Sequence, residues 1–319
     1  MIDEIDARIL EIVQEYGQLT IMDVASSLGV TRSWAWKKVK RLERAGLLRL
    51  EKRGRSIVVR PAEHVYKGLL RIGILRASEY PYILHLRHLL LGRYSMVKII
   101  VYDEAYKLAL DLAAGKVQLA MAPVVTLMAL HRLSAGRIHI IGGGSHGGSG
   151  IIYSRSQGVG HATTMASTME LCAEAKKLPG PRIYMRSGSE ILEAVLDGRV
   201  GMGIVWEPYL YHAKEMGLDV EECGLPFCCV LGANKSLEPE YSRLSRYMEE
   251  AISRAIAGTV DLEAYSKLVG FPTELVKKTV KSYGFITEPP INSVRVLLDA
   301  IRNTIIPDKI VGDAFRVGP

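Results

Sequence analysis

The first thirty residues carry apolar side chains at helical spacing. A first helix is predicted by four of them, which recur every three or four positions and are followed by Gly17: Ile5, Ile9, Ile12 and Val13. A second helix is expected to follow Thr20, because Thr20 and Asp23 have the spacing of a capping box. Gly29 then predicts a tight turn.

A third helix and a hairpin are expected after that turn. Thr31 can cap the helix, and Ala35, Val39 and Leu42 form an apolar face at positions i, i+4 and i+7. Apolar and polar residues then alternate on both sides of the segment KRGR at 52–55. This pattern predicts two strands joined by a turn.

Positive charge is concentrated in the same region. Residues 31–60 contain eleven Lys and Arg and two acids, whereas the whole chain has a net charge of +7. A basic block in an otherwise balanced chain indicates a nucleic-acid interface, because its charges neutralise phosphates. The alternative is a solvated helix face, but such faces usually mix the two signs.

Three helices and a basic hairpin resemble a winged helix-turn-helix of the Lrp, MarR and ArsR type, most clearly in VTRSWAWKKVKRLERAGLLRL at 30–50. The resemblance implies that the third helix enters the major groove and that the hairpin tip reaches phosphates or the minor groove. Double-stranded DNA is the implied partner. Of Trp34 and Trp36, one ring is expected on the first helix and the other on the DNA. The predicted DNA-binding residues are Arg32, Ser33, Trp36, Lys37, Lys40, Arg41, Lys52, Arg53 and Arg55.

From residue 69 onward, short apolar runs alternate with helical segments. Strands are predicted at 69–75, 97–103, 116–123 and 137–144, and helices at 104–114 and 124–135. This alternation is typical of an α/β fold with a parallel sheet that helices cover on both faces.

Two segments of this region share one design. LAAGKVQLAMAP at 112–123 and VLDGRVGMGIVWEP at 195–208 each contain a helix end, a Gly, a basic residue, an apolar strand and a Pro that opens the next helix. Ligands bind beyond the carboxyl ends of parallel strands, where helix N-termini can donate N–H groups. Two such units therefore indicate two lobes that face one cleft.

Residues 69–319 resemble the type 2 periplasmic binding proteins, especially the branch of sulfonate, taurine, nitrate and thiamine-pyrimidine receptors. The matching segments are AAGKVQLAMAP, GGGSHGGSGIIYS and EAVLDGRVGMGIVWEPYLYHAKEMG. Where that family has a GKKVAVPxGST-like strand, this chain has HATTMASTMELCAEAKK, which keeps only Ser167 and Thr168 as a helix cap. The resemblance implies a bilobed α/β fold with two parallel or mixed sheets flanked by helices.

The predicted organisation is a winged helix-turn-helix at 1–60, a linker at 61–68 and a binding-protein-like domain at 69–319. Lobe I is expected to comprise 69–149 and 227–319, and lobe II to comprise 150–226, with the two crossovers as the hinge. Helices that return to lobe I are expected near 239–257, 273–283 and 291–303.

The resemblance and the chain geometry place the same residues at the cleft. About half of the following set is expected to line it, and the others to be caps or core contacts. The predicted ligand-binding residues are Ser78, Glu79, Tyr80, Asp103, Tyr106, Pro123, Val124, Ser145, His146, Ser167, Thr168, Ser187, Ser189, Trp206 and Glu207. The aromatic members favour a flat ligand, and Arg76 is a candidate partner for an anion.

Other candidate chemistry is weaker. GGGSHG at 142–147 matches G-x-G-x-x-G, but an apolar strand follows it instead of a helix, so we interpret the glycines as a hinge and as room for a close approach to ligand. His146 has no nucleophile and orienting acid near it in sequence. Small buried thiols are the prediction for the four cysteines, Cys172, Cys223, Cys228 and Cys229. We therefore predict no metal, no cofactor and no enzymatic activity.

Composition adds little to this interpretation. The chain begins without a signal-peptide pattern and has no apolar run of about 18 residues, so we expect a cytoplasmic protein with no membrane partner. Only seven Asn and Gln occur among many charged residues, which is typical of thermophilic proteins.

The combined hypothesis is a ligand-responsive DNA-binding regulator, similar in plan to the LysR type but without an evident linker helix. Ligand would close the lobes and reposition two DNA-binding heads, which predicts a homodimer. Two alternatives remain: an enzyme of the thiamine-pyrimidine or menaquinone pathways on the same fold, and a constitutive DNA binder with a degenerate sensor.

Overall fold

The computed structural model describes residues 4–16, 18–54, 56–61, 67–91, 93–156, 158–300 and 313–316. The chain falls into two compact units. The first contains residues 1–71 and 87–98, and the second contains residues 72–86 and 99–319. Most of the predicted linker at 61–68 lies outside the described residues.

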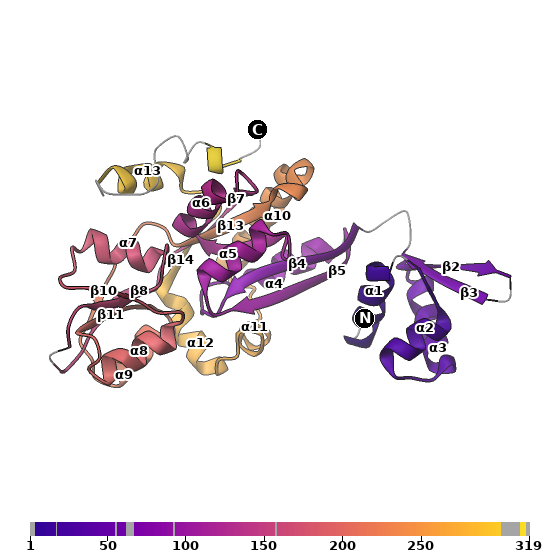
Figure 1. Cartoon of the computed structure of the whole chain (residues 1–319), viewed down its shortest axis with the longest axis horizontal. Coiled ribbons are helices and arrows are strands. Elements are labelled where there is room, and N and C mark those ends of the chain that lie inside the picture. The colour runs from indigo at the N-terminus through magenta and orange to yellow at the C-terminus, as the bar shows by residue number, and fades with distance from the viewer. Residues whose placement is uncertain are drawn as a thin grey trace. The chain divides into compact units, whose positions relative to one another are not determined.

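The first unit combines helices with a small antiparallel sheet of order β1-β3-β2 (Figure 1). Its elements are α1 (Glu4–Tyr16), β1 (Leu19–Thr20), α2 (Ile21–Leu28), α3 (Arg32–Arg44), β2 (Leu48–Arg53) and β3 (Ser56–Pro61). The predicted capping box is present: Thr20 and Asp23 each accept the backbone N–H of the other. Gly29, with φ of 64°, ends α2 and allows the tight turn into α3.

The core of this unit follows the predicted apolar pattern. Ala35, Val39 and Leu42 of α3 are buried and pack with apolar residues of α1, α2 and the hairpin. Thr31 caps α3 by accepting the N–H of Trp34. The predicted hairpin is formed by β2 and β3, and Arg55 at its tip lies outside the described residues.

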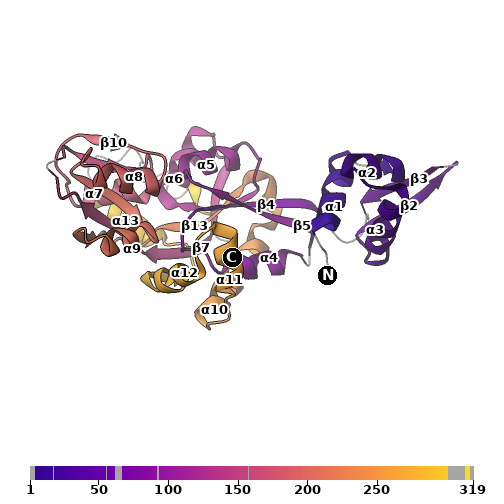
Figure 2. The ribbon, with the colours of Figure 1, turned by 90° about the horizontal axis from the view of Figure 1, so that it is seen from below.

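Two further sheets belong mainly to the second unit, although one of them includes residues 67–71 and 94–98, which are grouped with the first unit. We call the six-stranded sheet with its helices lobe I, and the five-stranded sheet with its helices lobe II. The strand order in lobe I is β14-β7-β13-β6-β4-β5 (Figures 1 and 2). Its first elements are β4 (Lys67–Leu75), α4 (Ile83–Leu91), β5 (Tyr94–Tyr102), α5 (Ala105–Ala113), β6 (Leu119–Pro123), α6 (Val124–Leu133) and β7 (Ile138–Gly147).

The chain returns to the lobe I sheet with β13, which pairs antiparallel with β6 on one side and β7 on the other. The elements from there on are β13 (Cys229–Asn234), η1 (Lys235–Glu240), α10 (Tyr241–Ile256), α11 (Leu262–Val269), α12 (Thr273–Thr279), η2 (Val280–Ser282), β14 (Tyr283–Ile286) and α13 (Ile291–Ala300). Of the predicted returning helices, the end of the last, 301–303, lies outside the described residues. Helix α11 was not predicted.

Lobe II has the strand order β10-β9-β11-β8-β12. Helix α7 lies on one face of this sheet, and α8 and α9 lie on the other (Figure 1). The elements are β8 (Ser149–Tyr153), β9 (His161–Thr163), α7 (Thr168–Ala175), β10 (Arg182–Tyr184), α8 (Gly188–Leu196), β11 (Met202–Trp206), α9 (Tyr209–Glu215) and β12 (Val220–Glu222).

Both sheets are mixed rather than purely parallel. Strands β4 and β6 are parallel, as are β9, β10 and β11, whereas β7, β8, β12, β13 and β14 pair antiparallel. The fold is therefore the α/β bilobed architecture with mixed sheets that the sequence predicts.

The glycines of β7 have a different role from the one expected. A Cβ at Gly144 would lie 1.9 Å from the carbonyl oxygen of Cys229, and one at Gly143 would lie 2.0 Å from that of Ile286. These glycines therefore make room for the neighbouring strands to approach β7, and not for a ligand to do so. Gly147 and Gly148, with φ of 80° and 65°, make the crossing from β7 to β8.

Two of the four cysteines also differ from the prediction. Cys172 of α7 and Cys223, which follows β12, have Cα atoms 5.5 Å apart and form a disulfide. Cys228 and Cys229 are free and buried. The two cysteines are 51 positions apart in the sequence. Their pairing therefore depends on the packing of lobe II and not on a local sequence pattern.

Candidate functional site

The predicted DNA-binding face lies on α3 and the β2–β3 hairpin. Exposed side chains on this face are Arg32, Ser33, Lys37, Arg41, Lys52 and Arg53. The Thr31 cap and the buried apolar face of α3 fix which side of the helix these residues occupy. Such a helix with an exposed basic side is suited to the major groove.

Three predicted members of this face also make contacts within the unit. Trp36 is half-buried and packs on the hydrophobic core, while Lys40 lies 5.1 Å from the centre of its ring. Arg41 pairs with Asp6 of α1, whose carboxylate is buried and also lies 3.4 Å from Lys38. Arg41 therefore joins α1 to α3, a role that the spacing of charges along one helix does not reveal.

A second candidate site is a cleft between the two lobes of the second unit. Its empty volume is about 390 Å³, part of which is open to solvent. Lining residues from lobe I are Leu75, Glu79, Tyr80, Asp103, Ala105, Pro123, Cys228 and Cys229, and those from lobe II are Thr164, Ser167, Thr168, Met169 and Trp206. Clefts between lobes, beyond the carboxyl ends of parallel strands, are the usual ligand sites of α/β folds.

The lobe I wall is centred on Glu79, which is 2% exposed. Ser145 donates a hydrogen bond to its carboxylate, and Tyr80 donates one to the sulfur of Cys229 at 3.0 Å. The sulfur atoms of Cys228 and Cys229 are 3.4 Å apart. Burial raises the pKa of the Glu79 carboxyl, although the hydrogen bond from Ser145 opposes this effect, and burial raises the pKa of the Cys229 thiol well above its usual value.

The lobe II wall is the segment that leads into α7. Ser167 caps this helix, as predicted, by accepting the N–H groups of Met169 and Glu170. Thr164 and Ser167 are hydrogen-bonded through their hydroxyl groups at 2.7 Å. The hydroxyl oxygen of Thr168 approaches the thiol of Cys228, but it has no hydrogen-bond partner among the described residues.

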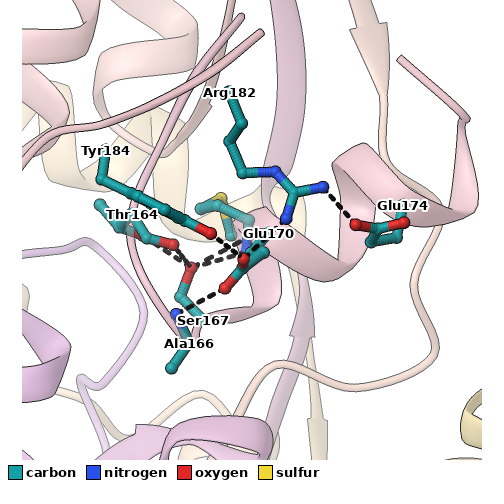
Figure 3. Close-up of polar contacts among 8 residues, drawn as sticks. Thr164, Ala166, Ser167, Glu170, Glu174, Arg182 and Tyr184 are labelled. Atoms are coloured by element: carbon teal, nitrogen blue, oxygen red, sulfur yellow. Dashed lines mark hydrogen bonds and ion pairs between the residues drawn. The ribbon is translucent and has the colours of Figure 1, made fainter. Parts of the chain in front are cut away.

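A network of charged residues holds this segment in place (Figure 3). Glu170 accepts the N–H of Ala166 at 2.6 Å and pairs with Arg182 of β10 at 2.8 Å. Arg182 also pairs with Glu174 one turn further along α7, and Tyr184 donates to Glu170. The network joins α7 to β10 and thereby positions the cleft-lining residues that precede and begin α7.

Trp206 connects the two walls. Its indole N–H, at the end of β11, donates to the carbonyl oxygen of Arg76 at 3.1 Å. Arg76 itself pairs with Asp103 at 2.6 Å and donates to the carbonyl oxygen of Val269. Arg76 is thus engaged by lobe I and is not among the described residues that line the cleft.

The structure brings seven of the predicted ligand-binding residues to the cleft: Glu79, Tyr80, Asp103, Pro123, Ser167, Thr168 and Trp206. The following residues do not line it: Ser78, Tyr106, Val124, Ser145, His146, Ser187, Ser189 and Glu207. Several of these have structural roles. Ser187 caps α8, Ser78 accepts a hydrogen bond from Thr279, and Glu207 accepts the N–H of Tyr211 in α9.

Several lining residues were missed by sequence reasoning, above all Cys228 and Cys229. They reach the cleft because β13 runs antiparallel to β6, so that the start of β13 lies beside the end of β6, where Cys229 is opposite Pro123. The residues of a strand do not show whether it will pair parallel or antiparallel with its neighbours. A usable signal was the adjacent thiol pair that precedes an apolar strand.

The comparisons with known proteins fit both parts of the chain. The model of a winged helix-turn-helix DNA-binding family matches residues 2–49. No curated protein matches the chain. Among the described residues, no helix has the length and apolar character needed to cross a membrane.

Solved structures resemble the remainder of the chain. The ligand-binding component of an ABC-type import system from Staphylococcus aureus, with zinc bound, has a TM-score of 0.64 at 15% identity over 79% of this chain and 97% of its own. The alkanesulfonate-binding protein of Xanthomonas axonopodis pv. citri, bound to MOPS, has a TM-score of 0.60 at 16% identity over 80% of this chain and 100% of its own.

The periplasmic nitrate-binding protein of Synechocystis PCC 6803 has a TM-score of 0.60 at 11% identity over 78% of this chain and 86% of its own. At such identities the likeness establishes the fold alone. The chain therefore joins a winged helix-turn-helix to the bilobed fold of the periplasmic binding proteins.

Proposed function

We propose that the protein is a DNA-binding transcriptional regulator whose activity responds to a small ligand in the cleft between lobes I and II. The observation that carries this proposal is the presence, in one chain, of a winged helix-turn-helix and a two-lobed fold with a cleft lined from both lobes. A ligand that contacts both walls binds the closed arrangement more tightly than an open one, and this difference can drive a change in DNA affinity.

The cleft lining supports ligand binding better than catalysis. It combines aromatic, hydroxyl, thiol and carboxyl groups, and it contains no Lys, Arg or His among its described members. His146, the candidate base, packs against Gly284 of β14 and does not line the cleft. These features give no support to His146 as a general base in the cleft.

The same lining bears on the class of ligand. The structural neighbours include proteins described as binding an alkanesulfonate and nitrate, which are anions. This cleft presents Glu79 and Asp103, and the nearby Arg76 is paired with Asp103. We therefore propose a neutral or cationic ligand rather than an anion of the kind those neighbours bind.

A pair of DNA-binding units is part of the proposal. Winged helix-turn-helix regulators commonly bind as dimers, which predicts a homodimer and two half-sites about one helical turn apart, or a multiple of that spacing. The operator can be recovered by selecting genomic fragments with the purified full chain.

The test measures DNA affinity with and without ligand. A thermal-shift panel of thiamine precursors, sulfonates, nitrate, amino acids and nucleobases first identifies a binder, which at 100 times its dissociation constant adds about 2.7 kcal/mol of stability. That binder is then expected to change operator affinity by about 5-fold or more. Trp206→Ala should abolish the response without altering ligand-free DNA binding, whereas Lys37→Ala should weaken DNA binding in both states. DNA affinity that no cleft ligand changes would instead identify a constitutive DNA binder.

A further inference from the structure

Three side chains that can bind a metal meet on the lobe I wall of the cleft. Glu79, Cys228 and Cys229 are all buried, and their ligand atoms lie within 4.8 Å of one another. We propose that these residues bind a thiophilic divalent cation, with zinc as the representative, and leave one coordination position open to the cleft. This site differs from our sequence-based expectation of small buried thiols.

The distances suit such an ion after a small adjustment. At a Zn–S distance of about 2.3 Å, sulfur atoms 3.4 Å apart subtend an angle of about 95° at the metal. Opening this angle to the tetrahedral value requires the sulfurs to separate by about 0.4 Å. Rotation of the two side chains can supply that movement. A carboxylate oxygen of Glu79 then completes three protein ligands, which is the usual number in zinc sites with an open position.

Outer contacts already orient two of the three ligands. Ser145 donates to the carboxylate of Glu79, and Tyr80 donates to the sulfur of Cys229. The backbone N–H of Tyr80 is in turn held by the hydroxyl of Tyr265, which donates to the carbonyl oxygen of Ala77. Hydrogen-bonded partners of this kind fix ligand orientation in metal sites and raise metal affinity.

Two further observations concern the side of the proposed metal site that faces the cleft. The hydroxyl oxygen of Thr168, on lobe II, is buried and has no hydrogen-bond partner among the described residues. The lining carries carboxyl groups and, in its described part, no cationic side chain. A cation beside Glu79 is therefore not opposed by positive charge, and a ligand in its fourth position can occupy the space next to Thr168.

The donor set also sets the selectivity. Among divalent cations, two thiolates favour zinc or cadmium, whereas magnesium and calcium prefer sites made of oxygen alone. Magnesium at millimolar concentration should therefore not compete. The pair Cys172–Cys223 is joined in a disulfide, so the free thiols of the chain are those of the proposed site.

The ion has a consequence for regulation that rests on the proposed function. Its protein ligands come from lobe I, and Thr168 and Trp206 of lobe II line the same cleft. An ion with its fourth ligand would therefore contact both lobes and favour their closed arrangement. The metal ion would then either be the effector itself or bind the effector as its fourth ligand.

The experiment is a cobalt titration of the full chain under anaerobic conditions, after a thiol assay has established two free thiols per molecule. Tetrahedral cobalt bound to thiolate gives a charge-transfer band in the near ultraviolet, and displacement by zinc then yields the zinc affinity. We expect one ion per chain, no displacement by magnesium, and at least about 10-fold weaker zinc binding in Cys228→Ser, Cys229→Ser and Glu79→Gln. Tyr80→Phe, which keeps all three ligands, should weaken binding by about 10-fold.

The matched control is the double variant Cys172→Ser/Cys223→Ser, which keeps the site and should keep the charge-transfer band. Absence of that band in the unmodified chain would overturn the proposal, and so would an unchanged band in both Cys228→Ser and Cys229→Ser. The unmodified chain gives an answer even if a variant does not fold.

Measurement of DNA affinity with and without zinc separates this inference from the proposed function. If zinc binds and leaves DNA affinity unchanged, the metal site stands and its coupling to DNA is refuted. If zinc fails to bind but another cleft ligand changes DNA affinity, the regulator stands and the metal site is refuted.

Discussion

Lys37→Ala gives a direct test of the proposed DNA face. Lys37 is exposed on α3, next to residues that pack in the core of the first unit. Its removal should leave the fold unchanged and delete one phosphate contact. Because each such contact releases counterions, the loss is measurable in the salt dependence of binding, even on DNA without an operator.

The magnitude follows from the exposed charges of the face. Four of its exposed basic residues are Arg32, Lys37, Lys52 and Arg53. If each contacts one phosphate, the logarithm of the affinity of one DNA-binding unit falls with the logarithm of salt concentration with a slope of about −3.6. Raising salt from 50 to 200 mM then weakens the binding of one unit about 150-fold, and Lys37→Ala should reduce this factor to about 40-fold.

Arg41 provides the contrast. Arg41 pairs with the buried carboxylate of Asp6, which also lies 3.4 Å from Lys38, so Arg41→Ala removes one positive partner from a buried negative charge. We expect a loss of about 1–3 kcal/mol in the stability of the first unit and a smaller change in salt slope than for Lys37→Ala. The two variants thus separate charge that contacts DNA from charge that holds α1 to α3.

Fluorescence anisotropy of a labelled 30-base-pair duplex, repeated at several salt concentrations, measures the slope for each variant. Lys267→Ala on α11, where Lys267 pairs with Glu263, is a control outside the first unit and should leave the slope unchanged. A slope for Lys37→Ala equal to that of the unmodified chain, in a protein with an unchanged melting temperature, would show that Lys37 does not contact DNA.

The other predictions concern stability and are tested by thermal or chemical denaturation. Gly144→Ala should cost more than about 2 kcal/mol because the added Cβ meets the backbone of β13, whereas Gly224→Ala, with open space but φ of 67°, should cost about 1 kcal/mol. Ser167→Ala removes the cap of α7 and should cost about 1 kcal/mol and speed amide exchange in that helix. Burial lowers the pKa of His139 to about 4, so the unfolded chain takes up the proton first as pH falls from about 6.5 to 4. The free energy of unfolding should therefore fall by at most about 3 kcal/mol between pH 6.5 and 4, and by less in a His139→Gln variant. Equal falls in both proteins would show that His139 is not responsible for this pH dependence.

The first unit is the part of the fold that the sequence predicted most completely. Its helices, capping box and hairpin are specified by residues within a few positions of one another, such as Thr20 with Asp23 and Ala35 with Val39. The proposed DNA face is the side of α3 opposite its buried residues. The pairing of Arg41 with Asp6 was not predictable, because it depends on how α1 crosses α3.

The cleft was predicted in part. Pro123 and Trp206 were found because they end apolar strands, and the carboxyl ends of strands are where such folds bind ligands. Ser145 and Glu207 occupy similar positions along the chain, yet both are turned toward internal hydrogen bonds. Sequence places a residue at the end of a strand but does not decide whether its side chain faces the ligand or the core.

The sequence by itself determined the local elements, the class of fold and the basic character of the first unit, because these depend on periodicity and charge within short segments. Only the tertiary structure decided which strands pair antiparallel, which cysteines join and which remain free. The insertion of β13 beside β6 brings Cys228 and Cys229 to Glu79, about 150 positions away in the chain. Contacts at that separation arise from the packing of whole elements, which no local pattern encodes.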